Sequence, residues 1–339
     1  MSIIKDVGCG SRMIGKTEKT IDVASGAMIM AMGIFLLGAI HQFSYIEQLF
    51  DLLFVIVLIT WIIILVRFIR SIFIVDFLKN LWNQSIQSFG LGTWIAATSV
   101  MTILIHQHFP NVIGIQYIVY LNCIAWLLYM LFSCLQLKKI IINRAVYDLH
   151  GVILLTTVST QSIACLLMET IQKTNILIIV LGIVLYLFSI VLIVIRFKCK
   201  HFSLHEWRNT DCIIHGALSI TGLAMTLSQT IEFQLLLIFW FVVFCLFIIV
   251  EIFEILRGIS RVKLYGIRKA IFTYHISQWS RNFTFGMFYY FTFNLINYAE
   301  GRYELYFQTK FMYGLGWVVL VLLIVEIVLF LVPRKITTN

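Results

Sequence analysis

Two aspartate–histidine pairs are the residues of this sequence whose types could bind a metal ion or perform acid–base chemistry. Asp148 stands shortly before His150, and Asp211 stands shortly before His215. Imidazole and carboxylate groups are common zinc ligands, and a membrane-embedded enzyme or sensor would need all four to converge. Helix capping and hydrogen bonds between helices explain the same residues without a ligand. We therefore predict no metal, no catalytic residue and no cofactor, and we place His150 and His215 at a cytoplasmic mouth.

Arg281 is a basic residue within a long apolar stretch of the chain. A cation at membrane depth is costly, and it usually faces a cavity or a partner of opposite charge. At helical spacing Arg281 shares one face with Phe285, Phe288 and Thr292. A positive charge one turn before an aromatic plug suits a path for anions. A structural salt bridge to Glu326, an acid in the last apolar stretch, explains Arg281 as well.

Hydroxyl and amide side chains recur within other apolar stretches, where each needs a partner or water. Some of them will bond to the carbonyl of the residue four positions earlier, because a helix turns its side chains in all directions. We predict that six of these polar residues line a pore: Thr98, Thr157, Gln161, Ser219, Thr226 and Thr292.

The composition sets the class of protein that these residues belong to. Of 339 residues, 61% are hydrophobic and 12% are charged, and the mean hydropathy is +0.97. Because soluble domains carry roughly 25% charged residues, a soluble enzyme, a nucleic-acid-binding domain and a disordered chain are excluded. The presence of only two prolines and of long Ile, Leu and Val runs favours helices over barrel strands, which alternate over about 10 residues. We predict an all-α polytopic membrane protein.

Ten apolar stretches are long enough to cross the hydrocarbon core, which takes about 20 residues. Ten crossings put both termini on one side, and most of the 25 lysines and arginines fall on that side. The positive-inside rule therefore predicts cytoplasmic termini in a plasma-membrane protein. The stretches are 25–41, 47–68, 89–108, 113–136, 149–169, 175–196, 212–230, 234–256, 274–298 and 311–332.

A cytoplasmic arm (1–24) and a short tail (333–339) flank the predicted membrane domain (25–332). The arm contains GSRMIGKT at 10–17, which matches the phosphate-loop pattern. A phosphate loop follows a strand and opens a helix of an α/β domain, and that context is missing here. We interpret the arm as a basic segment near anionic lipid headgroups.

The stretches alternate in character with a period of about 64 residues, which indicates a repeated helical hairpin. The even stretches are almost continuous Ile, Leu, Val and Phe, whereas the odd ones carry glycine and hydroxyls. Four odd stretches open near a glycine: Gly26, Gly90, Gly151 and Gly216. Since lipid solvates apolar side chains, we expect the even helices outside and the five odd helices in an inner ring around a central pore. Tight packing of small residues is the alternative reason for the glycines.

Ten crossings in five parallel hairpins with polar inner helices resemble the tellurite-resistance/dicarboxylate transporter family, which belongs with the slow, voltage-dependent anion channels. In that family an aromatic–Thr–Phe–Pro stretch carries a phenylalanine that plugs the pore. The matching stretch here is Phe283-Thr284-Phe285-Gly286, so the resemblance implies Phe285 as the plug. Spacing alone does not choose Phe285 over Phe288. Gly286 replaces the proline, and the Asn-Pro that often precedes the first crossing is absent. The resemblance also implies a homotrimer of separate pores.

These observations predict an anion channel or uniporter that passes small anions and is no enzyme. No Asp or Glu lies in the middle of an odd stretch, whereas coupled carriers usually need an intramembrane carboxylate. Without a strong binding site, weakly hydrated anions such as nitrate would pass more readily than chloride. The alternatives are a secondary carrier or exporter of dicarboxylates, sulfite or tellurite-type oxyanions, and the enzyme or sensor considered above. A carrier built from two inverted halves would show opposite repeats, and the parallel period argues against it.

Overall fold

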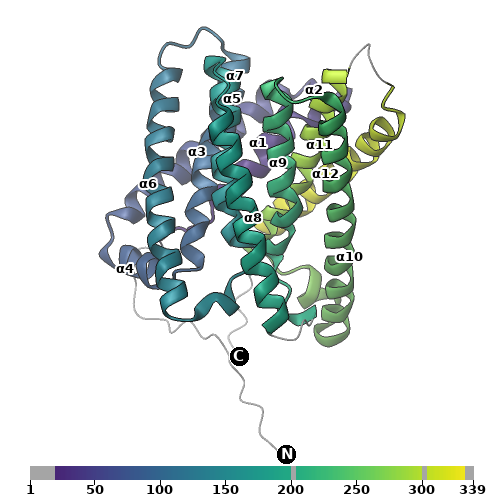
Figure 1. Ribbon diagram of the computed structural model, residues 1–339. Coiled ribbons are helices and arrows are strands. Elements are labelled where there is room, and N and C mark those ends of the chain that lie inside the picture. Colours follow the sequence, from purple (N-terminus) through teal and green to yellow (C-terminus); the bar gives the residue numbers. More distant parts are fainter. Residues whose placement is uncertain (1–19, 200–203, 300–303, 333–339) are drawn as a thin grey trace, which may run out of the picture.

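The computed structural model describes residues 20–199, 204–299 and 304–332, and the described residues form helices without a strand (Figure 1). The GSRMIGKT motif, the first part of the arm and the tail lie outside these residues. Each of the ten predicted stretches coincides with a helix. Eight helical segments are long and apolar enough to cross a membrane. The prediction of an all-α polytopic membrane protein is therefore confirmed.

The five odd stretches form α1 (Gly26–Leu37), α5 (Gly92–His108), α7 (Leu155–Ile171), α9 (Ile213–Ser228) and α11 (Trp279–Ala299). Around the molecule α1 packs on α5, α5 on α7, α7 on α9, α9 on α11, and α11 packs back on α1. The inner helices thus close into the predicted ring. Short 3-10 turns lead into several of them, among them Gln87–Leu91, Gly151–Leu154 and Asn209–Cys212.

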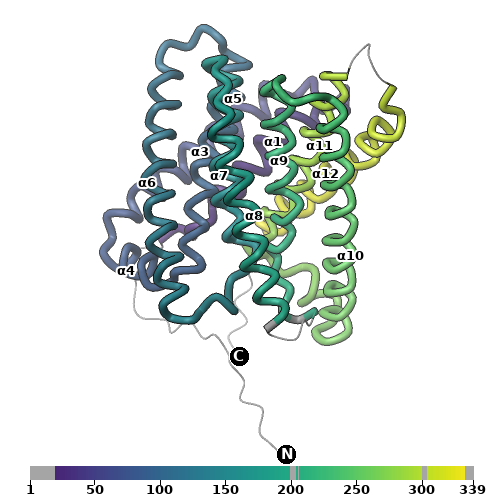
Figure 2. Tube along the Cα trace, in the orientation of Figure 1, coloured from purple at the N-terminus to yellow at the C-terminus, as the bar shows by residue number. Residues whose placement is uncertain are grey.

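The five even stretches form the outer layer: α3 (Phe50–Ile72), α6 (Ile115–Ile142), α8 (Ile176–Cys199), α10 (Phe233–Ile271) and α12 (Tyr306–Leu331). Figure 2 shows α6, α8 and α10 standing around the inner helices. In their most apolar windows 22% to 33% of the residues are buried, against 83% to 89% for the windows of α5, α7 and α9. Because Ile, Leu and Val are compatible with lipid tails, this exposure is the expected state of an outer layer.

Two helical segments at the outer layer were not predicted from the sequence. α10 continues to Ile271, well beyond the predicted end at residue 256, and it is interrupted at Gly266, whose φ is 75°. The extension (257–271) is rich in lysine and arginine, so hydropathy does not mark it as part of a membrane crossing. A short helix, α4 (Val75–Asn83), follows α3. It lies at the same end of the molecule as the extension of α10 (Figure 1).

Glycines set the close approach between neighbouring inner helices. A Cβ at Gly216 of α9 would overlap the side chain of Thr284 on α11, and one at Gly151 would overlap the backbone of Thr210. The same relation, in which a glycine faces the next inner helix, recurs around the ring: Gly26 faces Thr93, Gly92 faces Leu155 and Gly286 faces Ile34. The repeated glycines therefore serve tight helix packing, which small residues permit in membranes.

Substituting Gly216 with alanine is expected to destabilise the ring by about 1–3 kcal/mol, the usual cost of overpacking. Gly258 of α10 is the matched control, since a Cβ there meets nothing within 4 Å. Thermal unfolding in detergent should show a lower midpoint for Gly216→Ala than for Gly258→Ala. Equal midpoints for the two variants would mean that α9 and α11 tolerate a larger separation.

Candidate functional site

A small cavity lies within the ring of inner helices, because all five of them contribute to its wall, and it is called the axial cavity below. Its volume is about 20 Å³, which is room for about one water molecule. No small anion fits through it in this conformation. The wall consists of Ile34 and Leu37 of α1, Ser99, Val100 and Ile103 of α5, Ser162, Cys165 and Glu169 of α7, Ile220, Leu223 and Leu227 of α9, and Met287 and Tyr290 of α11.

Two hydroxyls form a polar section in the middle of this axial cavity. Ser99 Oγ lies 3.4 Å from Ser162 Oγ, and it accepts a hydrogen bond of 2.9 Å from the Asn122 amide of α6. The Ser162 hydroxyl also donates to the Ser159 carbonyl at 2.8 Å. Hydroxyls held in this way offer weak dipoles without a charge. In this conformation both hydroxyls are engaged with carbonyls and with each other, and the surface of the cavity is almost entirely apolar.

A carboxylate stands at the end of the cavity where the inner helices finish. Glu169, in the last turn of α7, lines the cavity together with Tyr290. The Gln107 amide of α5 donates a hydrogen bond of 3.3 Å to Glu169 Oε2. The sequence places no Asp or Glu in the middle of an odd stretch, and Glu169 does not contradict this. Glu169 is the last residue of the predicted stretch 149–169, and only the ring geometry turns it toward the axis.

The face of α11 that carries Arg281 turns to the outer helix α10. Arg281 forms an ion pair with Glu251 of α10. On the same face Trp240 Nε1 of α10 donates a hydrogen bond of 2.9 Å to Thr292 Oγ1. The alternative of a salt bridge between Arg281 and Glu326 therefore does not hold, because the partner of Arg281 is Glu251. Glu251 lies toward the end of a stretch that is otherwise strongly hydrophobic.

Glu326 occupies a different environment on α12. Its side chain is buried, and its Oε1 atom has no hydrogen-bond partner among the described residues. Neither Arg281 nor Glu326 lines the axial cavity. The pair with Glu251 gives Arg281 a structural role in fastening α11 to α10, since an ion at membrane depth needs such a partner.

The two gate candidates point in the same direction as Arg281. The Phe285 ring lies 5.0 Å from the Phe247 ring of α10, and the Arg281 guanidinium lies 5.5 Å from the Phe285 centroid. The Phe288 ring packs against Trp240 of α10 at 5.6 Å. Neither phenylalanine lines the axial cavity in this conformation. As gate residues, both stay predictions.

The opposite face of α11 is directed to the axis. Met287 and Tyr290 line the cavity. Phe283 is buried, and it lies four residues before Met287 and therefore on the same face of the helix. The stretch Phe283-Thr284-Phe285-Gly286 thus contains one phenylalanine on each side of α11. Gly286 contacts Ile34 of α1, which fixes the rotation of α11 about its own axis.

None of the six pore-lining candidates contributes to the wall of the axial cavity. Ser219, Thr226 and Thr292 donate to carbonyls four residues earlier, at 2.8–2.9 Å. Gln161 reaches outward, and its amide donates to the Ile179 carbonyl of α8 at 3.0 Å. Thr157 is buried with its oxygen unpartnered among the described residues, and Thr98 is half-buried. Their part in conduction stays a prediction.

His150 lies just before the inner helix formed by α7, with Nδ1 2.7 Å from Thr210 Oγ1. Burial, together with the charges of Arg208 and Arg196, lowers the pKa of His150 to about 3. The imidazole is therefore neutral at physiological pH. The placement of His150 at a cytoplasmic mouth stays a prediction.

His215 lies deeper, fully buried between two aromatic rings. The Phe247 and Phe285 centroids are 5.1 Å and 6.1 Å away, and neither nitrogen of His215 has a hydrogen-bond partner among the described residues. Within the same residues no group of three or more His, Cys, Asp or Glu side chains is arranged to hold a metal ion. The convergence that a metal-dependent enzyme would need is therefore missing there.

Asp211 joins two inner helices at the end where they begin. Its carboxylate is completely buried and accepts hydrogen bonds from the backbone N–H of Gly151 at 2.7 Å and of Arg208 at 2.8 Å. The buried Arg196 of α8 pairs with it at 3.4 Å. Asp211 thus acts as a structural connection between the segments leading into α7 and α9.

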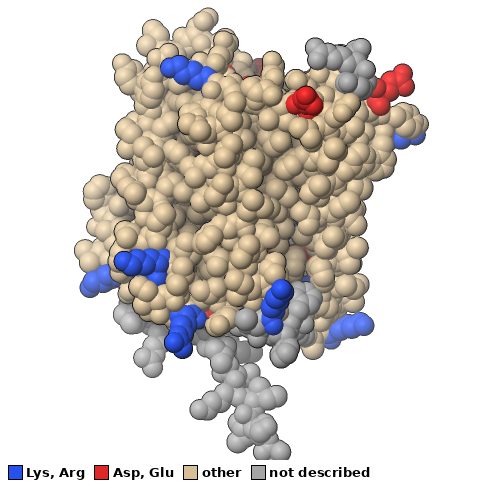
Figure 3. All heavy atoms as spheres, viewed as in Figure 1, with Lys and Arg blue, Asp and Glu red and all other residues tan. Residues whose placement is uncertain are grey.

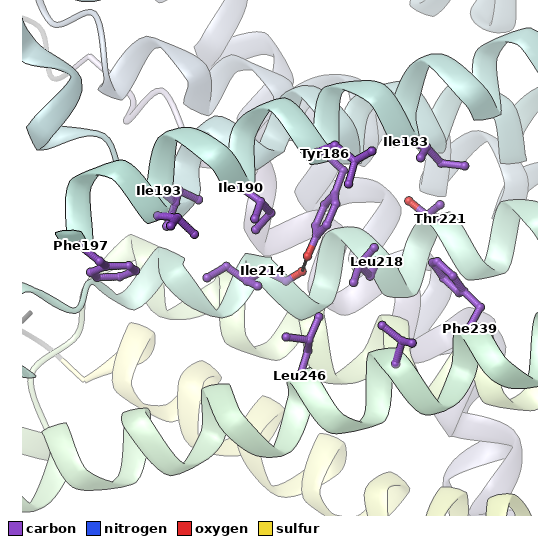
Figure 4. Close-up of a pocket in the computed structure, with 13 residues that line it drawn as sticks. Ile183, Tyr186, Ile190, Ile193, Phe197, Ile214, Leu218, Thr221, Phe239 and Leu246 are labelled. Carbon is purple, nitrogen blue, oxygen red and sulfur yellow. Dashed lines mark hydrogen bonds between the residues drawn. The ribbon is translucent and has the colours of Figure 1, made fainter.

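A larger cavity of about 490 Å³ lies between α8 and α10 over α9 (Figure 4). Tyr186 spans it, and its hydroxyl donates to the Ile214 carbonyl at 3.2 Å. The wall is almost entirely apolar, with side chains such as Leu218 and Phe239. Because α8 and α10 belong to the outer layer, this cavity faces the lipid and is unsuited to an anion.

Five inner helices in a ring and five outer helices around them define an all-helical, polytopic membrane protein. The comparison with protein families identifies its family: residues 21–333 match the model of the voltage-dependent anion channel family. The chain belongs to that family, and the resemblance seen in the sequence is confirmed. No curated protein matches the chain. The protein is thus a multi-pass membrane protein of anion transport.

Proposed function

We propose that the protein is an anion channel or uniporter whose path runs along the axis of the inner ring. The cavity shared by all five inner helices carries this proposal, because every repeat helps to line it. Its paired serine hydroxyls and the absence of lysine or arginine from its wall support a weak site. A weak site favours rapid passage of poorly hydrated monovalent anions.

In this proposal the axis is closed by side chains of α11. Met287 and Tyr290 line the cavity, and Phe283 continues their face toward the beginning of the helix. A phenylalanine plug remains part of the proposal, and helical spacing favours Phe283 over Phe285, because Phe283 shares a helix face with Met287 and Tyr290. The gate inferred from the family resemblance, Phe285 with Phe288, would need α11 to rotate before either ring reached the axis.

Orientation and assembly follow from charge and from the family resemblance. On the face shown in Figure 3, most lysine and arginine side chains lie at the end that carries α4, and acidic groups lie at the opposite end. The positive-inside rule therefore supports cytoplasmic termini in the cell membrane. The resemblance supports a homotrimer with one axis in each protomer.

The test is anion flux in liposomes that hold the purified protein, with nitrate or chloride gradients and an impermeant cation. The proposal predicts an anion-selective flux in which nitrate exceeds chloride. Absence of flux for both anions, in wild type and in the opened variant described below, would refute a channel or uniporter.

A coupled carrier of organic anions or oxyanions is the second candidate, and Glu169 on the axis favours it. Intramembrane carboxylates often serve as proton relays in carriers. In the same liposomes a carrier would move anions without a measurable single-channel current, and its flux would saturate with anion concentration.

A further inference from the structure

Glu169 is the acidic residue on the wall of the axial cavity. It lies in the last turn of α7, so an anion that travels along the axis must pass its carboxylate. We propose that Glu169 is a proton-binding site on the anion path and that anions pass when it is protonated. This inference rests on the proposed function, since it assigns a role to a side chain of the same path.

The surroundings of Glu169 leave its charge uncompensated. From α5 it faces Gln107, which donates one hydrogen bond, and His106 is the nearest cationic candidate, with a buried Nδ1 that has no described partner. From α11 it faces Tyr290, and Cys165 stands one turn earlier on α7. Within the described residues no lysine or arginine forms an ion pair with Glu169.

The remaining two inner helices present apolar side chains to the same end of the cavity. Leu227 of α9 and Leu37 of α1 line the wall there. An ionised carboxylate in this half-buried setting repels an anion at close range. A protonated carboxyl group has no net charge and can donate a hydrogen bond from its O–H group to the passing anion. The proton comes from the solvent at the nearby mouth, and it leaves by the same route.

The test compares wild type with Glu169→Gln in liposomes, with internal pH fixed and external pH varied from about 7.5 to about 3.5, a range that includes the ordinary glutamate pKa of about 4.3. Wild-type anion flux should rise about tenfold or more as the external pH falls. Glu169→Gln mimics the protonated form, so its flux at the higher pH should equal that of wild type in acid and should hardly change with pH.

Glu232→Gln is the matched control. Glu232 is exposed at the same end of the molecule, precedes α10 and makes no capping hydrogen bond with its side chain. It should keep the wild-type profile. If Glu169→Gln elutes as aggregate, Glu169→Ala replaces it, with the same expected loss of pH dependence. His106→Gln shows whether the nearby histidine contributes.

Two results would overturn the inference in distinguishable ways. A Glu169→Gln variant that passes anions with the unchanged pH profile, or a profile that only His106→Gln removes, would refute the role of Glu169 and leave the proposed function intact. Absence of anion flux in every variant, including those opened at the axis, would remove the proposed function and this inference with it.

Discussion

Replacing Phe283 with alanine is expected to raise anion flux through the protein at least tenfold. The axial cavity holds about 20 Å³, so the path is closed by side-chain packing alone. Phe283 shares its helix face with Met287 and Tyr290, which line that cavity. Removing its ring opens the axis next to a polar section formed by two serines. Current or flux in liposomes, with nitrate as the permeant anion, measures the effect.

Phe285→Ala is the matched control for this prediction. It removes the same ring from the same helix, two residues away, at a position that contacts Phe247 of the outer layer. Flux through Phe285→Ala should stay at the wild-type level. The reverse outcome, with Phe285→Ala open and Phe283→Ala closed, would show that α11 rotates before conduction and that the family resemblance assigns the plug correctly. Since a buried Phe→Ala change often costs 3–5 kcal/mol, only variants that elute as wild type are compared.

Asp211→Asn is expected to produce the largest loss of stability, about 3–5 kcal/mol. The substitution leaves the buried Arg196 guanidinium without its counter-ion, and it places an amide where two backbone N–H groups donate to a carboxylate. An uncompensated buried charge is far more costly than the loss of an exposed ion pair. Two inner helices lose their connection at the same time.

The midpoint of thermal unfolding in detergent measures this loss, which corresponds to a decrease on the order of 10 °C. Asp51→Asn is the control, because the Asp51 side chain is 85% exposed and only approaches His108 at 3.6 Å. Its midpoint should match that of wild type. A wild-type midpoint for Asp211→Asn would show that the Arg196 pair does not hold the ring together.

The arrangement of the helices could be predicted because it depends on gross polarity. Apolar outer helices and glycine-bearing inner helices alternate in the sequence, and lipid separates them in the way that alternation indicates. Gly216 and Gly151 were noticed as a repeat before their neighbours were known. The close contacts with Thr284 and Thr210 give that repeat its physical cause.

The direction of each helix face could not be predicted in the same way. Spacing placed Arg281, Phe285 and Thr292 on one face correctly, but periodicity fixes relative and not absolute orientation. Aromatic residues surround α11, so no polar side marks the axis. One signal was available in Gly286, since a glycine in this ring faces a neighbouring inner helix.

The polarity of a side chain also does not predict whether that side chain lines the axial cavity. Ser219, Thr226 and Thr292 satisfy their hydroxyls on their own backbone, a bond that any helical Ser or Thr can form. Glu169 could not be assigned to the axis from the sequence, because a charged residue at the end of an apolar stretch usually marks the boundary between membrane and water. The ring turns that boundary residue inward, beside Gln107.

Modification of Cys165 tests the central claim, that anions travel along the axis, most directly. Cys165 is a free, buried cysteine on the wall of the axial cavity. In the opened Phe283→Ala background a small anionic thiol reagent should reach it and block the flux, and a reducing agent should restore the flux. Cys165→Ser in that background should abolish the block, and mass spectrometry should confirm modification of Cys165. Full flux through protein that carries the modification, or an open variant in which Cys165 never reacts, would contradict an axial path.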